Sequence, residues 1–207
     1  MSKVLLINGS PNAQGCTYTA LREVASQLRE NNIETEILHI GAGPILDCMA
    51  CGACRETGRC FEDDVVNIAA RRMKECDALI VGCPVYFAGP SGRLVCFLDR
   101  LFYSAGGTFA GKLGACVVSA RRGGCTASLD RLAKYFEFAR MPMVSSTYWN
   151  MVHGNTPEEV AQDREELQTI RNLGRDMAWM PRCIEVSRNA GVPVPAAERA
   201  ERTNFIR

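Results

Sequence analysis

The chain has 207 residues, enough for one domain with an extension, and 47% of them are apolar, enough for a layered core. Its 24 Lys and Arg nearly balance its 23 Asp and Glu, and a net charge of +1 argues against a protein that binds the nucleic-acid backbone. No apolar run reaches the length of a membrane span and residues 1–7 carry no signal-peptide pattern, so we expect a cytoplasmic protein.

The first expected element is a strand over residues 4–7, and the loop 8–17 leads from it into a helix over residues 17–30. A helix N-terminus offers backbone N–H groups to an anion, and Ser10, Asn12 and Thr17 add neutral donors. The loop lacks the Gly-Lys-Ser/Thr ending that suits a nucleoside triphosphate and the Gly-x-Gly-x-x-Gly turn that suits a pyrophosphate. It therefore indicates a site for a single terminal phosphate, and an ordinary polar turn is the alternative.

A second strand is expected over residues 34–40, and a cysteine-rich insert over residues 44–61 follows it. Cys48, Cys51, Cys54 and Cys60 have the spacing C-x2-C-x2-C-x5-C. Zinc sites more often pair two C-x2-C units across a longer spacer, so this spacing favours a [4Fe–4S] cluster with all four thiolates as ligands. The order of the insert would then depend on the metal. Thiols that bind no metal, a redox disulfide and zinc are the alternatives.

Helices and strands alternate through the rest of the chain. The expected helices cover residues 62–75, 90–104, 126–139 and 156–180, and the expected strands cover residues 78–81, 114–118 and 142–147, with an extended arm after residue 181. This order predicts a parallel sheet with helices on both faces, whose ligands bind beyond the C-terminal ends of the strands. Loops 8–17, 83–89 and 119–125 meet at that edge.

The loop after residue 83 combines a rigid proline with aromatic side chains, in the order Pro84, Val85, Tyr86 and Phe87. A flat, partly apolar ring could stack there while backbone N–H groups reach its heteroatoms. The alternative is that Tyr86 and Phe87 simply pack beneath a helix.

These motifs, with Gly9-Ser10-Pro11, Gly92 and Leu98-Asp99-Arg100, resemble the NAD(P)H-dependent FMN reductase family over about residues 3–147. The resemblance implies an α/β, flavodoxin-like three-layer sandwich with a five-stranded parallel sheet in the order 2-1-3-4-5. It also implies FMN as cofactor, with its phosphate near Ser10, Asn12, Cys16 and Thr17. Pro84, Val85, Tyr86 and Phe87 would line the isoalloxazine, and residues 119–124, including Ser119, Arg121, Gly123 and Gly124, would border its far edge. The thiol of Cys16 is a weak donor, so its contact would come from the backbone.

The cysteine insert resembles that of the iron–sulfur flavoproteins, a branch of the same family. Two functions follow from the resemblance. The first is an oxidoreductase that takes electrons from NAD(P)H onto FMN and passes them to a flavin, quinone or similar small-molecule or protein acceptor. The second relays electrons between a ferredoxin-like partner and FMN through the cluster. A third hypothesis is a module that binds a phosphate-containing ligand and has no redox activity.

We expect residues 1–180 to form the FMN-binding domain and residues 181–207 to form a C-terminal extension. The extension, with Phe205 and Ile206, would pack across a neighbouring subunit of a homodimer or homotetramer. His39 and His153 show no carboxylate partner by spacing, so no catalytic triad is expected. Asp99 and Arg100 should end a helix and form a structural ion pair.

Overall fold

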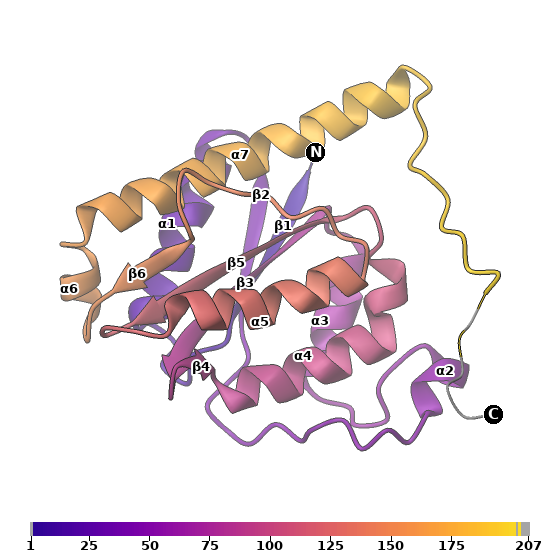
Figure 1. Cartoon of the computed structure of the whole chain (residues 1–207), viewed down its shortest axis with the longest axis horizontal. Helices are drawn as coiled ribbons and strands as arrows, with labels where there is room; N and C mark the ends of the chain where they lie inside the picture. The colour runs from indigo at the N-terminus through magenta and orange to yellow at the C-terminus, as the bar shows by residue number, and fades with distance from the viewer. Residues whose placement is uncertain (1, 202, 204–207) are drawn as a thin grey trace.

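The computed structural model describes residues 2–201 and 203, and a twisted parallel sheet forms the middle of the molecule (Figure 1). The strands are β1 (Lys3–Asn8), β2 (Glu34–His39), β3 (Ala78–Tyr86), β4 (Gly89–Pro90), β5 (Leu113–Ala120) and β6 (Met151–His153). Their order is β2-β1-β3-β5-β6, all parallel, and β4 pairs antiparallel with the end of β3. With β4 set aside, this is the predicted five-stranded order 2-1-3-4-5.

Helices cover both faces of this sheet. They are α1 (Cys16–Glu30), α2 (Ala53–Thr57), α3 (Val65–Lys74), α4 (Gly92–Ala105), α5 (Cys125–Phe138), α6 (Pro157–Val160) and α7 (Arg164–Asn189), with a 3-10 turn, η1 (Gly106–Thr108). Residues of α1 and α7 pack on one face, and residues of α3, α4 and α5 pack on the other. The predicted flavodoxin-like three-layer sandwich is thus confirmed.

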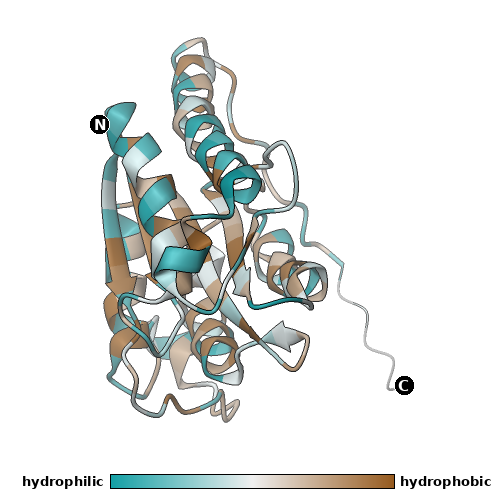
Figure 2. Cartoon of the chain, turned by 90° about the vertical axis from the view of Figure 1, so that its left-hand side faces the viewer, coloured by the Kyte–Doolittle hydropathy of each residue, from teal (hydrophilic) through white to brown (hydrophobic). Residues whose placement is uncertain are grey.

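The central strands are apolar on both sides because both faces of the sheet are covered. In β1, Leu5 and Ile7 join the core beneath α3 and α4, whereas Val4 and Leu6 join the core beneath α1 and α7. All four side chains are fully buried. Each contributes about 1.5–3 kcal/mol to the free energy of unfolding. Figure 2 shows this distribution as brown strands between helices whose outer faces are teal.

Two glycines bring the first loop close to β3. The N–H of Gly9 donates a hydrogen bond to the carbonyl of Gly82 over 2.9 Å. A Cβ atom at Gly9 would lie 2.8 Å from that carbonyl oxygen, and one at Gly82 would lie 2.6 Å from Leu21 Cδ1. A side chain at Gly9 would therefore clash with β3, and one at Gly82 would clash with α1, so the two glycines allow the first loop and α1 to lie this close to β3.

The predicted strand over residues 142–147 is wrong. Met143 makes one bridge opposite Gly114, and the chain then leaves the sheet. Pairing resumes only at β6, beside residues 118–120 of β5. A strand of three residues is too short to show a periodic pattern, whereas the apolar residues near Met143 mimic one.

The predicted helix over residues 156–180 is two helices, α6 and α7, and α7 continues through Pro181 to Asn189. Proline usually ends a helix because it lacks the N–H that bonds to the preceding turn. Here Pro181 is buried, and its neighbours Met180 and Ile184 pack against the core, so packing maintains the helix. The predicted arm after residue 181 is therefore wrong up to Asn189, and residues 192–201 have no regular structure.

The described part of the tail contacts the domain of the same chain. Arg140 Nη2 donates a hydrogen bond to the carbonyl of Pro195 over 2.9 Å. Phe205 and Ile206 lie outside the described residues.

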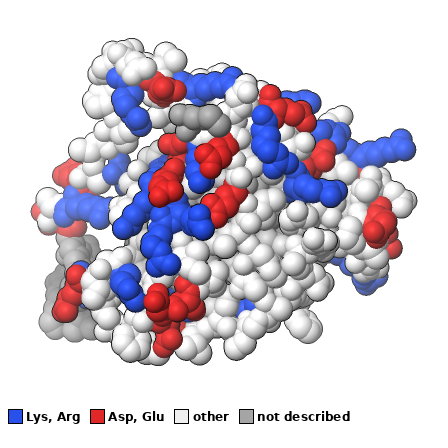
Figure 3. Space-filling model, turned by 180° about the vertical axis from the view of Figure 1, so that it is seen from behind, with Lys and Arg blue, Asp and Glu red and all other residues white. Residues whose placement is uncertain are grey.

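Within residues 2–201 and 203, none of the helices combines the length and apolar character needed to cross a membrane. The face in Figure 3 carries Lys and Arg interspersed with Asp and Glu, as the nearly balanced charge leads one to expect.

Candidate functional site

The three predicted loops meet at the C-terminal edge of the sheet. Thr17 Oγ1 and Ser119 Oγ lie 2.7 Å apart and join the start of α1 to the end of β5 in a buried hydrogen bond. A Cβ atom at Gly124 would lie 2.5 Å from Ala88 Cα, so the third loop touches the second directly. The structure therefore brings the predicted phosphate and ring loops together into one region.

The first loop is held in shape by its own side chains. Asn8 is fully buried, and its Oδ1 accepts a hydrogen bond from the N–H of Ser10 over 3.1 Å. Ser10 Oγ accepts in turn from the N–H of Asn12 over 3.1 Å. Helix α1 begins at Cys16 without a side-chain cap, so its first N–H groups face the loop. These groups form a cradle of neutral donors, an arrangement that suits an anion.

The Cys16 thiol does not point into this cradle. Its Sγ donates to the carbonyl of Gly154 over 3.5 Å, beyond β6. Any contribution of Cys16 to an anion site therefore comes from its backbone N–H. Ser10 and Thr17 are buried and Asn12 is exposed at the mouth of the loop.

The second loop is a tight hairpin between β3 and β4. Val85 pairs with Pro90 and Tyr86 pairs with Gly89, and the two residues between them have positive φ, +50° at Phe87 and +59° at Ala88. Two positive φ values suit a two-residue hairpin, but for residues with a side chain they cost roughly 1–2 kcal/mol each. Such strain concentrates at functional sites. The Phe87 side chain is fully exposed and Tyr86 is half exposed, so the interpretation that both pack beneath a helix is wrong.

The third loop carries one buried, one partly buried and two exposed members of the predicted set. Ser119 is buried against Thr17, and Gly124 lies against the hairpin with a φ of +94°. Arg121 and Gly123 are exposed at the rim. The contacts of Ser119 and Gly124 fix the loop, and Arg121 and Gly123 are accessible to a ligand.

The sequence prediction missed a carboxylate partner of His153. The N–H of His153 donates to Asp163 Oδ2 over 2.8 Å, and its Nδ1 lies 3.4 Å from the same oxygen. Its Nε2 lies 3.9 Å from the sulfur of Cys125. Burial raises the pKa of the Cys125 thiol to about 11, so this thiol stays protonated near neutral pH and is a poor nucleophile. No fixed spacing links these residues, so no motif could have revealed them.

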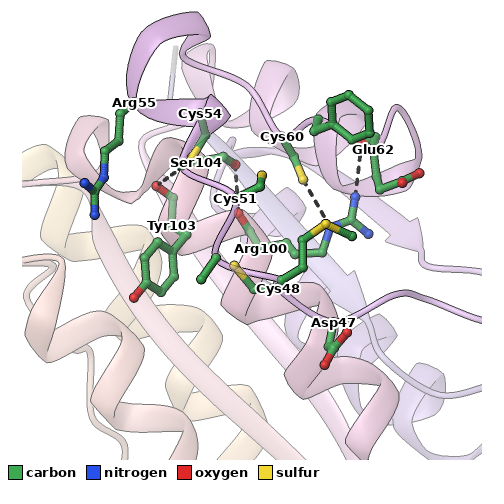
Figure 4. Close-up of a pocket in the computed structure, with 14 residues that line it drawn as sticks. Asp47, Cys48, Cys51, Cys54, Arg55, Cys60, Glu62, Arg100, Tyr103 and Ser104 are labelled. Carbon is green, nitrogen blue, oxygen red and sulfur yellow. Dashed lines mark hydrogen bonds between the residues drawn. The ribbon is translucent and has the colours of Figure 1, made fainter.

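The predicted cysteines line a second site, a pocket between the 46–62 segment and α4 (Figure 4). All four thiols, Cys48, Cys51, Cys54 and Cys60, border this pocket. They come from the loop before α2, from α2 itself and from the loop after it. Cys54 Sγ donates to the carbonyl of Tyr103 over 3.8 Å, which ties α2 to α4.

Arg100 forms the floor of the cysteine pocket and is 2% exposed. It lies within α4 and not at its end, and its ion-pair partner is Asp64, with Nη1 2.6 Å from Oδ2. The neighbouring Asp99 pairs with Arg131. The prediction of a structural ion pair is confirmed for Arg100, whereas the Asp99 pair is long and exposed, and the predicted helix end is wrong.

The donor chemistry of the pocket fits an iron–sulfur cluster. All eleven cysteines are free thiols, and soft thiolates are the ligands that such clusters use. Among the residues that the structure describes, no three His, Cys, Asp or Glu side chains converge closely enough to hold one ion. A [4Fe–4S] cluster has a different iron at each thiolate, so its four ligands surround a volume, as the lining of this pocket does.

Comparison with known proteins identifies the family of the chain. A family model described as NADPH-dependent FMN reductase matches residues 2–156. An iron-sulfur flavoprotein of Methanocaldococcus jannaschii is 31% identical over 191 residues, which cover 88% of this chain and 99% of that protein. An iron-sulfur flavoprotein of Methanosarcina thermophila is 28% identical over 195 residues, which cover 90% of this chain and 99% of that protein.

Solved structures share the fold. The apo form of an NADH:FMN oxidoreductase superposes with a TM-score of 0.65 at 17% identity, covering 87% of this chain and 90% of that one. A WrbA-like flavodoxin from Agrobacterium tumefaciens has a TM-score of 0.61 at 20% identity and covers 88% of this chain and 99% of that one. At these identities the similarity concerns architecture, and the functional argument must come from the sites.

Proposed function

The chain belongs to the NADPH-dependent FMN reductase family, and on that basis we propose that it is an FMN-dependent oxidoreductase that also carries a [4Fe–4S] cluster. One observation carries the proposal: the four thiols of the motif line a single pocket on α4, the helix that begins just after the hairpin. The curated relatives support it, since they are named iron-sulfur flavoproteins and match nearly their whole length.

We propose that FMN binds at the C-terminal edge of the sheet. Its phosphate would accept hydrogen bonds from the first turn of α1 and from the hydroxyl groups and amide of Ser10, Thr17 and Asn12. Its ring would lie against Pro84, Val85, Tyr86 and Phe87, with Ser119, Arg121, Gly123 and Gly124 along the far edge. FMN supplies the redox chemistry when bound, and the protein supplies anchoring, stacking and access.

The protein's own residues determine how electrons enter and leave. The exposed hairpin and rim leave one side of the ring site accessible, which suits NAD(P)H or a small acceptor. The cysteine pocket lies on α4 with Cys51 exposed, so a cluster there would be accessible to a protein partner. We infer that a ferredoxin-like protein exchanges single electrons with FMN through the cluster, and that hydride transfer from NAD(P)H is the second route.

Anaerobically purified protein tests the proposal. We expect bound FMN, iron and sulfide in the proportion of one [4Fe–4S] cluster per chain, and reduction of both centres by a reduced ferredoxin-type donor. Steady-state oxidation of NADH or NADPH would support the second route. A protein that binds neither FMN nor iron after anaerobic reconstitution would contradict the proposal and leave a phosphate-ligand binding module.

We also propose a homodimer or homotetramer in the cytoplasm, with the FMN-binding domain extended to the end of α7. Phe87 and Phe138 are large, exposed aromatic side chains of the kind that subunit interfaces cover. Light scattering of FMN-loaded protein should give two or four times the chain mass of 22.7 kDa. A particle mass equal to that of one chain at micromolar concentration would contradict this expectation.

A further inference from the structure

Arg100 is a buried cation whose guanidinium N–H groups all have acceptors. Figure 4 shows its contacts with Cys60 and Glu62. Nη1 donates to Asp64 Oδ2 over 2.6 Å and to the carbonyl of Leu46 over 3.4 Å. Nη2 donates to Asp64 Oδ1 over 3.0 Å and to the carbonyl of Glu62 over 3.1 Å. The remaining donor, Nε–H, points to the sulfur of Cys60 over 3.2 Å.

These acceptors lie at both ends of the cysteine segment. Leu46 precedes Cys48 by two residues, and Glu62 follows Cys60 by two residues. One side chain of α4 therefore fixes where the segment enters and leaves the pocket. These contacts join protein groups to each other, so they hold the segment in addition to whatever a metal contributes.

The orientation of the guanidinium is fixed by its ion pair. Asp64 binds both terminal nitrogens side by side, the geometry in which an arginine holds a carboxylate most firmly. Asp64 is itself held, because its Oδ1 accepts from the N–H of Val66 at the start of α3. The Nε edge therefore faces Cys60 in a fixed direction.

A hydrogen bond to a ligating sulfur changes the reduction potential of an iron–sulfur cluster. A cluster held by four thiolates is an anion, and reduction adds one more negative charge. A donor aimed at one of those sulfurs stabilises the more negative, reduced form, and burial strengthens the effect.

We propose that Arg100 is a positioning residue for the iron–sulfur cluster and raises its reduction potential through the Nε–H bond to Cys60. This inference rests on the proposed function, since it requires a cluster in the pocket.

The test compares Arg100→Gln with a control variant of the same helix, Arg93→Gln. Arg93 also lies in α4 and also donates to backbone carbonyls of the preceding segment, at Gly41 and Gly43. Within the described residues its hydrogen bonds go to these carbonyls and not to a cysteine. Each reconstituted protein is titrated with dithionite, which donates one electron per cluster, and the reduced cluster is followed by electron paramagnetic resonance. We expect a lower midpoint potential in Arg100→Gln and an unchanged one in Arg93→Gln.

Arg100→Lys separates charge from geometry. Lysine keeps the positive charge but lacks the planar fork, so we expect a potential between those of the wild type and Arg100→Gln. Hydrogen exchange of metal-free protein gives a second measurement. Loss of a charge-assisted hydrogen bond should speed exchange in residues 46–62 by at least about tenfold in Arg100→Gln.

The outcomes distinguish the two proposals. A wild type that binds FMN but no cluster would contradict the proposed cluster function. A wild type with a cluster, beside Arg100 variants with the same potential and the same exchange rates, would contradict this inference alone. If Arg93→Gln lowered the midpoint potential as much as Arg100→Gln does, α4 would act only as a scaffold. That result would also contradict the proposed role of Arg100.

Discussion

Replacing Gly124 with alanine is expected to weaken FMN binding by at least about tenfold and to lower the free energy of unfolding by roughly 2–5 kcal/mol. The added Cβ would lie 2.5 Å from Ala88 Cα and 2.9 Å from Val85 Cγ1, so the ring hairpin would have to move. The φ of +94° also disfavours any residue with a side chain. FMN fluorescence quenching and thermal unfolding measure the two effects.

The neighbouring Gly123 provides the control. A Cβ atom there would meet no heavy atom within 4 Å, and its φ is not in the positive range. Gly123→Ala should therefore keep the wild-type stability, and a change in its FMN affinity would report on the rim of the site without movement of the hairpin. If both variants bound FMN as tightly as the wild type, the ring loops would be assigned to the wrong place.

Replacing Cys51 with alanine is expected to remove the iron–sulfur absorbance and the transfer of single electrons to a protein partner, while FMN stays bound. Cys51 is exposed, so its loss costs the fold little, and any change reports on ligation. Iron and sulfide analysis after anaerobic reconstitution measures the loss of the cluster, and the flavin spectrum measures retention of FMN.

Cys96 is the matched control for this variant. It lies on α4 but does not border the cysteine pocket. Cys96→Ala should therefore assemble a full cluster. A cluster content in Cys51→Ala equal to that in Cys96→Ala would mean that the motif does not ligate iron through all four thiols.

The central sheet could be predicted from the sequence because its signal is local. Four consecutive apolar residues in β1 require cover on both faces, and the loops after β1 and β3 mark the ligand edge. The last part of the sheet could not be predicted in this way. β6 has three residues and is specified by its pairing with β5, a contact between residues far apart in sequence.

The candidate sites also combine features with a local sequence signal and contacts between residues far apart in the sequence. The cysteine motif and the first loop can be recognised in the sequence because their residue types and spacing indicate their chemistry. Arg100 was assigned to an ion pair, but its contact with Cys60 spans 40 residues and follows only from how α4 packs on the cysteine segment. The His153–Asp163 contact depends on the break between α6 and α7, and no pattern of apolar residues predicts that break.

Helix α4 joins the two proposed centres. It begins at Gly92, just after the hairpin, and Arg100 follows eight residues later beneath the cysteine pocket. At about 1.5 Å per residue these points are about 12 Å apart along the helix axis. Electron exchange between flavin and cluster would then be a first-order event within one folded unit, with a rate independent of protein concentration. Only delivery and removal of electrons would depend on encounter with another molecule, so varying the partner's concentration separates the two steps.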